Sequence, residues 1–305
     1  MTEKIAVITG PTATGKTGIA VALAKMLDAE VVSADSMQVY RGFDIGTAKP
    51  TPAERDGIPH HLIDVVDPAA PFDAARFKRL ADAVIDEIHA RGRRVLVVGG
   101  TGLYIRALLH GLQKGPSPDP EIRKVLLERG RTEGWPALHR ELLERDEPTG
   151  RRLHPNDGVR ILRALEVVLS SRIPLSTWHA EHQFRETRYD ALLLVLKRPR
   201  AELNAIIEKR VDEMMAQGFL EETRALLEKG LSPALKPMQG LGYKRLVAHL
   251  LGELTLEEAV EKTKTDTRRF AKRQVTWFKK EPDIEWVSPD IATVSKRVSE
   301  HFSVG

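Results

Sequence analysis

Short apolar runs separated by amphipathic stretches predict strands alternating with helices along the first third of this chain. Four runs have the length of buried strands: residues 5–8, 30–33, 61–66 and 95–98. Between the first two runs, Ile19, Leu23 and Leu27 recur at the spacing of one helical face. Strands and helices that alternate in this way indicate a parallel, doubly wound α/β sheet.

A second amphipathic helix is predicted to begin after Asp73, which can cap it, and to end near Gly92. Its inward face is expected to carry four apolar side chains: Phe77, Leu80, Val84 and Ile88. The Gly-Gly-Thr-Gly turn at residues 99–102 then leads into another helix at Leu103. This order of elements continues the α/β pattern.

The pattern changes at residues 114–120, where glycine and prolines are typical of a linker. Residues 121–172 have helical spacing and contain no credible strand. Within them, Asn156 is expected to cap a helix with apolar and basic side chains on different sides: Val159, Leu162, Leu165 and Leu169 on one, Arg160 and Arg163 on the other. Residues 191–196 return to a strand, and residues 202–280 are helical.

The first strand leads into GPTATGKT at residues 10–17 and then directly into a helical pattern. This is a G-x-x-x-x-G-K-T phosphate-binding loop in the strand–turn–helix context that it requires. Lys16 is expected to bridge the terminal phosphates and Thr17 to reach a magnesium ion, while the helix N-terminus adds positive charge. The loop should therefore hold a di- or triphosphate. The predicted diphosphate ligands are Gly10, Pro11, Thr12, Ala13, Thr14, Gly15, Lys16 and Thr17.

These elements predict an α/β fold with a P-loop NTPase-like parallel sheet core, a helical insertion domain and a helical C-terminal part. The C-terminal helices should break at Gly218, at Gly230 and across residues 233–242. We expect three segments: residues 1–114 as the first part of the core, residues 115–190 as the insertion, and residues 191–305 as the remainder of the core with basic C-terminal helices.

An ordinary P-loop NTPase needs an acidic residue after its Walker B strand, but Thr101 follows two glycines there. The acid at a strand end is Asp35, just after residues 30–33. Ligands of open α/β sheets lie at the carboxyl ends of the strands, so Asp35, Thr101 and the phosphate loop should share one crevice. A lone carboxylate beside a diphosphate suits a general base. Alternatively, Asp35 caps a helix or supports magnesium, and Thr101 only caps the following helix.

Composition excludes several classes of function. The chain has no cysteine, so disulfides, thiolate metal sites and cysteine nucleophiles are excluded. It is 42% hydrophobic and 30% charged, which suits a globular protein, and no apolar run reaches the roughly 18 residues of a membrane span. The first strand begins within four residues of the N-terminus, so we expect no signal peptide and a cytoplasmic protein. No exposed apolar seam is evident, which favours a monomer.

Basic residues are unevenly distributed, although the net charge is only +4. Residues 262–280 contain eight Lys or Arg against one acid, Asp266. Four of these bases share one helical face: Arg269, Lys272, Arg273 and Lys280. Other segments contribute Arg123, Arg160, Arg163, Lys244 and Arg245. Most charge runs are solvated faces, but basic elements from several segments beside one core favour a nucleic-acid surface.

Taken together, the motifs resemble those of the tRNA dimethylallyltransferases, also called tRNA isopentenyltransferases or IPP transferases. The resemblance rests on GPTATGKT (10–17), SADSMQVY (33–40), IGTAKP (45–50), PHHLID (59–64), GGTGLY (99–104), HPND (154–157) with Arg160 and Arg163, and RRFAKRQVTW (268–277). It runs in order from the first strand to about residue 280, and this succession of motifs is highly specific.

The resemblance implies transfer of a dimethylallyl group from dimethylallyl diphosphate to N6 of the adenosine immediately 3′ of the tRNA anticodon. The loop would then hold an isoprenoid diphosphate rather than ATP. Asp35 would remove the N6 proton, and Thr101 would position the nucleophile or the diphosphate. Lys16, with Mg²⁺ on Thr17, would offset the charge that grows on the leaving group. Arg210 would add to this clamp, unless it is only an exposed helix arginine.

The resemblance also implies a tRNA-binding surface. The target base must leave its stack to reach a buried pocket, and residues 35–38 resemble the family's segment that meets the flipped base. The predicted tRNA contacts are Asp35, Ser36, Met37, Gln38, Thr101, Arg123, Val159, Arg160, Ile161, Leu162, Arg163, Lys244, Arg245, Arg269, Lys272 and Arg273.

Three other functions are weighed against this one. A small-molecule kinase or NTPase would use the same loop but needs a Walker B acid. An adenylate isopentenyltransferase would modify free AMP, ADP or ATP and needs neither the insertion nor a basic helix. A plain RNA-binding protein would not need Lys16, Thr17 and Asp35. His60 and His61 suggest a metal site, but adjacent strand residues point to opposite faces, so we expect structural roles.

Overall fold

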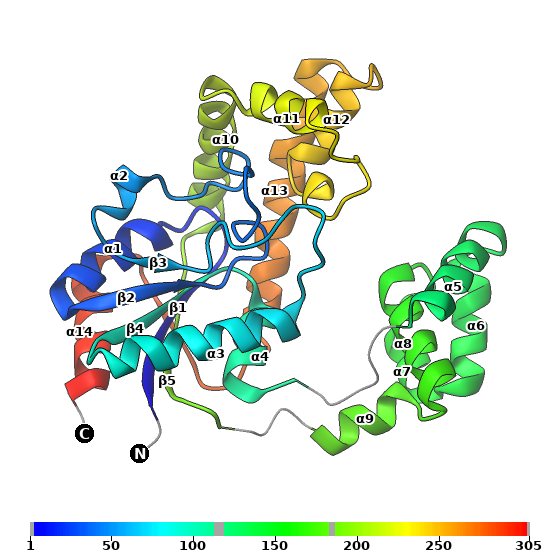
Figure 1. Ribbon diagram of the computed structural model, residues 1–305, viewed down its shortest axis with the longest axis horizontal. Coiled ribbons are helices and arrows are strands. Elements are labelled where there is room, and N and C mark those ends of the chain that lie inside the picture. Colours follow the sequence, from blue (N-terminus) through cyan, green and yellow to red (C-terminus); the bar gives the residue numbers. More distant parts are fainter. Residues whose placement is uncertain (1–2, 113–118, 183–186, 304–305) are drawn as a thin grey trace. The chain divides into compact units, whose positions relative to one another are not determined.

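The computed structural model of the protein describes residues 3–112, 119–182 and 187–303. The chain divides into two compact units, which we call the core unit (residues 1–109 and 187–305) and the insertion unit (residues 110–186). Figure 1 shows the elements of each unit. The sequence places the insertion at residues 115–190, but the core strand β5 already begins at Asp190.

The core unit is built on a six-stranded, wholly parallel sheet with the strand order β3-β2-β4-β1-β5-β6. Its strands are β1 (Lys4–Thr9), β2 (Ala29–Ser33), β3 (His60–His61), β4 (Arg94–Gly99), β5 (Asp190–Leu196) and β6 (Ile284–Val287). In the central strand, Ile5 is in register with Val95 and Ala191. The predicted α/β class is therefore confirmed, and the chain segments on both sides of the insertion build one sheet.

Helices cover the sheet because its strands are apolar on both faces. Side chains of α1 (Lys16–Leu27) and α14 (Ile291–Ser303) pack with Ala6, Ile8 and Leu96 into one core cluster. Helix α3 (Ala74–Ala90) packs against β2 and β4 from the other side (Figure 1). The short helices α2 (Pro52–Arg55) and α4 (Gly102–His110) follow β2 and β4.

The helical C-terminal part consists of α10 (Arg200–Ala216), α11 (Phe219–Glu228), the 3₁₀ helix η1 (Pro237–Gln239), α12 (Tyr243–Leu250) and α13 (Leu256–Phe278). Breaks fall at Gly218, at Gly230 and between residues 233 and 242, as predicted, and a further break between α12 and α13 was not predicted. The long helix α13 packs against α10 and α12. This packing brings α13 beside the sheet core (Figure 1).

The strand predicted at residues 61–66 is wrong beyond its first residue. Leu62 and Asp64 have φ angles of 61° and 56°, which a continuous strand does not permit. Val66 forms only an isolated bridge with Tyr40. The pattern also failed to predict β6, because a four-residue run at a sheet edge carries a weak signal, and it identified no separate helix at α14.

Helix α3 begins at the predicted cap, because the Asp73 side chain accepts a hydrogen bond from the Arg76 N–H. Its buried face differs from the prediction, since Ala81 and Ile85 point inward while Leu80 is exposed. The buried stripe thus runs through Ala81 and Ile85 rather than through Leu80.

The insertion unit is entirely helical over residues 119–182 and contains α5 (Pro120–Thr132), α6 (Trp135–Arg145), α7 (Glu147–Arg152), α8 (Gly158–Ser171) and α9 (Leu175–His182). Its core joins α5, α6 and α8 through six leucines and isoleucines: Leu126, Leu138, Leu142, Ile161, Leu162 and Leu165. Pro120, at the end of the predicted linker, begins α5, and residues 114–118 of that linker lie outside the described residues.

Two predictions for α8 are corrected. The N-cap is Asp157 rather than Asn156, because the Asp157 side chain accepts from the Arg160 N–H. Val159 is 78% exposed, whereas Ile161 is fully buried. At about 100° per residue, two positions apart face nearly opposite directions on a helix, so burying Ile161 turns Val159 outward.

Candidate active site

Backbone geometry explains the glycines of the phosphate loop between β1 and α1. Gly10 has a φ of 137°, and a Cβ there would lie 2.6 Å from the Leu196 carbonyl oxygen of β5. Gly15 has a φ of 91° and precedes the first residue of α1. Only glycine adopts the first of these conformations at such close approach, so the loop is folded tightly against the sheet.

Lys16 lies over the loop that contains it. Its Nζ donates hydrogen bonds to the carbonyl oxygens of Gly10 at 3.0 Å and Pro11 at 2.8 Å. Burial lowers the pKa of the Lys16 amino group to about 8, an effect that Asp35 opposes and Arg210 reinforces. Asp35 and Arg210 are thus the charged groups that most affect Lys16.

Arg210 is half-buried on α10 rather than an exposed helix arginine. Burial lowers the pKa of its guanidinium, and Glu213 opposes this effect. A partly desolvated guanidinium close to Lys16 gives the loop a second positive group. The Lys16 amino group and the Arg210 guanidinium are both suited to binding the oxygens of a diphosphate.

Asp35 and Thr101 follow the adjacent strands β2 and β4. The Asp35 Oδ1 accepts hydrogen bonds from the backbone N–H groups of Met37 at 2.8 Å and Gln38 at 3.2 Å. The Thr101 Oγ1 accepts from the Ser36 N–H at 3.1 Å. Asp35 thus forms a tight turn instead of a helix cap, and the Thr101 hydroxyl supports that turn rather than its own helix.

Gln274 is a site residue that sequence reasoning missed. It is buried on α13, where its Oε1 accepts from the Thr12 N–H at 2.9 Å and its Nε2 donates to the Gly100 carbonyl at 2.9 Å. The side chain thus connects the phosphate loop with the turn that precedes Thr101. Its position within the RRFAKRQVTW motif was the available signal, but a glutamine among basic residues gives no indication of its contacts.

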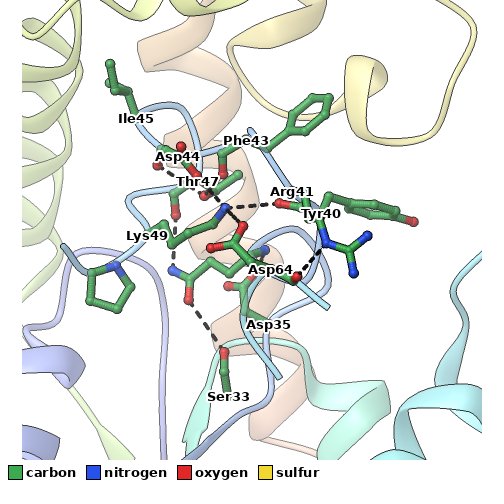
Figure 2. A network of polar contacts seen from close by, with 12 residues as sticks. Ser33, Asp35, Tyr40, Arg41, Phe43, Asp44, Ile45, Thr47, Lys49 and Asp64 are labelled. Atoms are coloured by element: carbon green, nitrogen blue, oxygen red, sulfur yellow. Dashed lines mark hydrogen bonds and ion pairs between the residues drawn. The ribbon is translucent and has the colours of Figure 1, made fainter. Parts of the chain in front are cut away.

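The segment after Asp35 forms a compact loop, residues 40–50, which Figure 2 shows from close by. The buried amino group of Lys49 donates to the Tyr40 carbonyl at 3.0 Å and pairs with the carboxylates of Asp44 and Asp64. The Gln38 Nε2 donates to two carbonyls of this loop. The IGTAKP and PHHLID motifs therefore meet in one network whose centre is Lys49 (Figure 2).

The predicted magnesium ligand Thr17 lies in the first turn of α1. It lines a small cavity together with Ser33, Gln38 and His60. Mg²⁺ prefers oxygen ligands and usually completes its shell with substrate phosphates and water, so the two hydroxyls of Thr17 and Ser33 fit such an ion. No cluster of three or more His, Cys, Asp or Glu able to hold a metal occurs among residues 3–112, 119–182 and 187–303.

The two adjacent histidines have different partners. His60 Nδ1 lies 2.9 Å from the Ile58 carbonyl, and His61 Nε2 lies 2.6 Å from the carboxylate of Glu30. Burial lowers the pKa of His60. Each histidine ring thus contacts a different partner within the core unit.

The predicted basic RNA contacts of the core unit lie on the helical C-terminal part. Lys244, Arg269, Lys272 and Arg273 are exposed. Arg245 is half-buried and pairs with Asp266 at 2.7 Å, so an ion pair within the protein neutralises its charge. Arg269 also pairs with Asp266, at 3.8 Å, but all four of these side chains are exposed and remain suitable for phosphate contacts.

The predicted contacts of the insertion unit divide into two groups. Arg123 and Arg163 both pair with the fully buried Glu166, at 3.3 and 3.0 Å, and Arg160 pairs with Asp157. Ile161 and Leu162 are buried in the core of this unit, so their side chains cannot contact tRNA, and these two predictions are wrong.

The comparisons identify the family. A family model described as IPP transferase matches residues 38–281, which is most of the chain. The chain belongs to the IPP transferase family. The match begins at Gln38, so it does not depend on the phosphate-loop motif.

Relatives of known name cover nearly the whole IPP transferase chain. The tRNA dimethylallyltransferase of Syntrophobacter fumaroxidans is 53% identical over 282 residues, which are 92% of this chain and 82% of that protein. The tRNA dimethylallyltransferase 2 of Geotalea uraniireducens is 52% identical over 302 residues, which are 98% and 97% of the two chains.

Solved structures of the family have the same fold. The full-length tRNA isopentenylpyrophosphate transferase of Bacillus halodurans matches with a TM-score of 0.74 and 39% identity, covering 99% of this chain and 97% of that one. A eukaryotic dimethylallyltransferase acting on tRNA matches with a TM-score of 0.82 and 30% identity, covering 99% and 79%.

Proposed function

We propose that this protein transfers the dimethylallyl group of dimethylallyl diphosphate to N6 of the adenosine 3′-adjacent to the tRNA anticodon. The observation that carries the proposal is geometric: Thr101 binds the turn that Asp35 forms, and Gln274 connects the adjacent Gly100 carbonyl with Thr12 of the phosphate loop. A carboxylate beside a diphosphate loop is an arrangement for a nucleophile that loses a proton. Relatives at 53% and 52% identity named tRNA dimethylallyltransferase support tRNA as the molecule that carries this nucleophile.

In the proposed reaction, the adenosine N6 forms a bond to C1 of the dimethylallyl group while the C1–O bond to diphosphate breaks. The N6 proton moves to the Asp35 carboxylate. Both described hydrogen bonds of Asp35 use Oδ1, so Oδ2 is the oxygen assigned to this proton. The Thr101 hydroxyl accepts from the Ser36 N–H, and its own hydrogen can then be donated toward the reacting groups.

The leaving diphosphate accumulates negative charge as C1 departs, and the loop is arranged to stabilise that charge. Lys16 and Arg210 are assigned to the phosphate oxygens, together with backbone N–H groups of residues 10–17. The hydroxyls of Thr17 and Ser33 are assigned to Mg²⁺, which supplies further charge neutralisation when bound.

The proposed macromolecular substrate is the tRNA anticodon stem-loop. The exposed bases of α12 and α13 are assigned to its phosphates, as are Arg123, Arg160 and Arg163 of the insertion unit. Residues 35–38 are assigned to the flipped adenine. The described helices include none with the length and apolarity to cross a membrane. We propose a cytoplasmic monomer.

Two alternatives have less support. A kinase or NTPase needs a magnesium-binding acid after β4, where this chain has Gly100 and Thr101. An adenylate isopentenyltransferase has no use for an insertion unit with several arginines at its surface. The named relatives act, by their names, on tRNA.

The proposal is tested by incubating the protein with labelled dimethylallyl diphosphate and each of three acceptors: an anticodon stem-loop, the same loop with guanosine at the target position, and AMP. We expect label on the adenosine loop alone. Label on AMP would assign the protein to the adenylate enzymes. ATP consumption without label transfer would assign it to the kinases or NTPases.

A further inference from the structure

Glu222 is a half-buried carboxylate on α11 that binds the backbone of the loop at residues 40–50. Its Oε2 accepts hydrogen bonds from the N–H groups of Asp44 at 3.0 Å and Ile45 at 2.8 Å, and its Oε1 accepts from Gly46 at 3.2 Å. The Tyr243 hydroxyl of α12 also donates to Oε1. Four donors therefore converge on the two oxygens of one carboxylate.

Apolar contacts hold the loop against the same two helices. A Cβ at Gly46 would lie 2.2 Å from the Phe219 ring and 2.6 Å from the Tyr243 ring. The ring of Phe43 lies 4.9 Å from that of Tyr243 in an edge-on arrangement. Glu222 therefore fixes the polar backbone of a loop that is already seated on an aromatic surface.

The loop in turn holds Gln38. The Gln38 Nε2 donates to the carbonyls of Thr47 at 3.2 Å and Ala48 at 3.1 Å, which occupies both amide hydrogens. The Gln38 Oε1 is directed toward the Ser33 hydroxyl, at 3.5 Å. The Gln38 backbone N–H is bound by Asp35, so the loop, the glutamine and the proposed base form one connected structure.

Lys49 and Glu222 have separate tasks in this structure. Lys49 links Tyr40, Asp44 and Asp64, and so determines the internal shape of the loop (Figure 2). Glu222 comes from a helix 178 positions away in sequence and determines where the loop lies.

We infer that Glu222 is a positioning residue of the transfer reaction, which acts by fixing the loop whose carbonyls orient Gln38 beside Asp35. This inference rests on the proposed function. Misplacement of reacting groups by about 1 Å can cost on the order of a hundredfold in rate, whereas the phosphate loop has no hydrogen bond to Glu222 among the described residues. Glu222 should therefore control turnover and leave diphosphate binding intact.

The test compares Glu222→Ala, Glu222→Gln and the matched control Glu221→Ala, which changes an exposed neighbour on the same helix. For each, we would measure kcat with the stem-loop, the Kd for dimethylallyl diphosphate, and hydrogen exchange of the loop amides. We expect Glu222→Ala to lower kcat on the order of a hundredfold and to speed exchange at Asp44, Ile45 and Gly46, with diphosphate Kd changed by less than about twofold. Glu222→Gln keeps an acceptor oxygen and should restore part of kcat, and the control should match wild type.

Two results would overturn the inference. One is a Glu222→Ala protein whose kcat stays within about twofold of wild type. The other is a loss of diphosphate affinity as large as the loss of kcat, which would make Glu222 a general support of the core unit. A wild-type protein that transfers no dimethylallyl would instead overturn the proposed function itself, and the positioning role with it.

Discussion

Gln274 binds the backbone N–H of Thr12 through its side-chain oxygen at 2.9 Å, although 262 positions separate the two residues in sequence. The other end of the same amide donates to the Gly100 carbonyl. A Cβ at Gly100 would lie 2.4 Å from this nitrogen, so the turn is shaped to admit the glutamine. Helix α13, which carries the exposed bases Arg269, Lys272 and Arg273, thus also holds the phosphate loop in place.

Replacing Gln274 with alanine should weaken diphosphate binding. The change removes both hydrogen bonds and leaves the buried Gly100 carbonyl unpaired, which costs about 1–3 kcal/mol, together with the half-buried Thr12 N–H. We expect a Kd for dimethylallyl diphosphate raised by about tenfold or more, measured by calorimetry, and a lower free energy of unfolding in urea. Arg273→Ala, at the exposed neighbouring position, should leave both quantities unchanged. Equal affinity in the two variants would contradict the role of Gln274.

Diphosphate affinity should depend on pH through Lys16. Its pKa is lowered to about 8 by burial, so the free protein loses this positive charge as the pH rises through 8. The unfolded chain keeps the proton until its ordinary pKa of 10.5, so this group makes stability rise with pH between about 8 and 10.5. The anionic ligand binds the charged form, and its Kd should therefore rise above pH 8, by up to about tenfold per pH unit.

The comparison variant for this prediction is Lys16→Arg, which stays charged throughout the range. Both proteins experience the same ionisation of dimethylallyl diphosphate, so the difference between their Kd profiles from about pH 7 to pH 9.5 isolates Lys16. Parallel profiles would show that Lys16 does not titrate in this range.

Asp35→Asn should separate chemistry from binding. The asparagine Oδ1 can still accept from the N–H groups of Met37 and Gln38, so the turn after β2 is preserved. The amide cannot take the N6 proton, and kcat should fall by about 10²–10⁴ while the Kd for the stem-loop is unchanged. Single-turnover kinetics and a binding titration measure the two quantities. A variant that retains wild-type kcat would exclude Asp35 as the base.

Lys272 and Arg273 should contribute to RNA binding through phosphate contacts. Each lies exposed on α13, and each neutralised phosphate adds about 0.7–0.9 to the slope of log K against log salt concentration. We expect the Lys272→Ala and Arg273→Ala variants each to reduce this slope by about that amount. Lys229→Ala, an exposed base outside the predicted RNA contacts, should retain the wild-type slope. An unchanged slope in all three variants would move the RNA surface elsewhere.

Gly102→Ala should destabilise the core unit. A Cβ at this position would lie 2.2 Å from Nε1 of Trp277, whose ring is covered on one side by the guanidinium of Arg106 at 4.4 Å. Overpacking of this kind costs about 1–3 kcal/mol. Gly18→Ala, in α1 with no atom within 4 Å of the added carbon, should instead stabilise by about 0.5–1 kcal/mol. Urea unfolding of both variants measures the difference, and a tolerated Gly102→Ala would show that Trp277 can move.

Local signals determined much of this protein from its sequence. The phosphate loop, the strands at residues 5–8 and 95–98 and the Asp73 cap depend on residues close together in the chain, so a short pattern describes them fully. The proximity of Asp35 and Thr101 was predictable as well, because parallel strands bring their carboxyl ends to one edge. The roles of these residues in catalysis and of the basic residues in RNA binding stay predictions.

Helix faces were predicted less well. Apolar periodicity shows that one face of a helix is buried, but the neighbouring elements determine which residues lie at the centre of that face. Leu80 and Val159 fit an apolar stripe in the sequence, yet both are exposed. Their helices are rotated by the partners against which they pack, and Ala81 and Ile161 are buried instead. Ile161 was predicted as an RNA contact from the family resemblance of its segment, but its side chain belongs to the core of the insertion unit.

The contacts that organise the site were decided only by the tertiary structure. Glu222 and Gln274 are polar residues within helices, and nothing adjacent to them distinguishes them from solvated side chains. Each satisfies backbone groups that lie 174 or more positions away along the chain. Hydrogen bonds depend on distance and angle in space, which a sequence pattern specifies only over a few residues. The sequence thus determined which chemistry the protein carries, and the packing of α11 and α13 on the core determined how its groups are held.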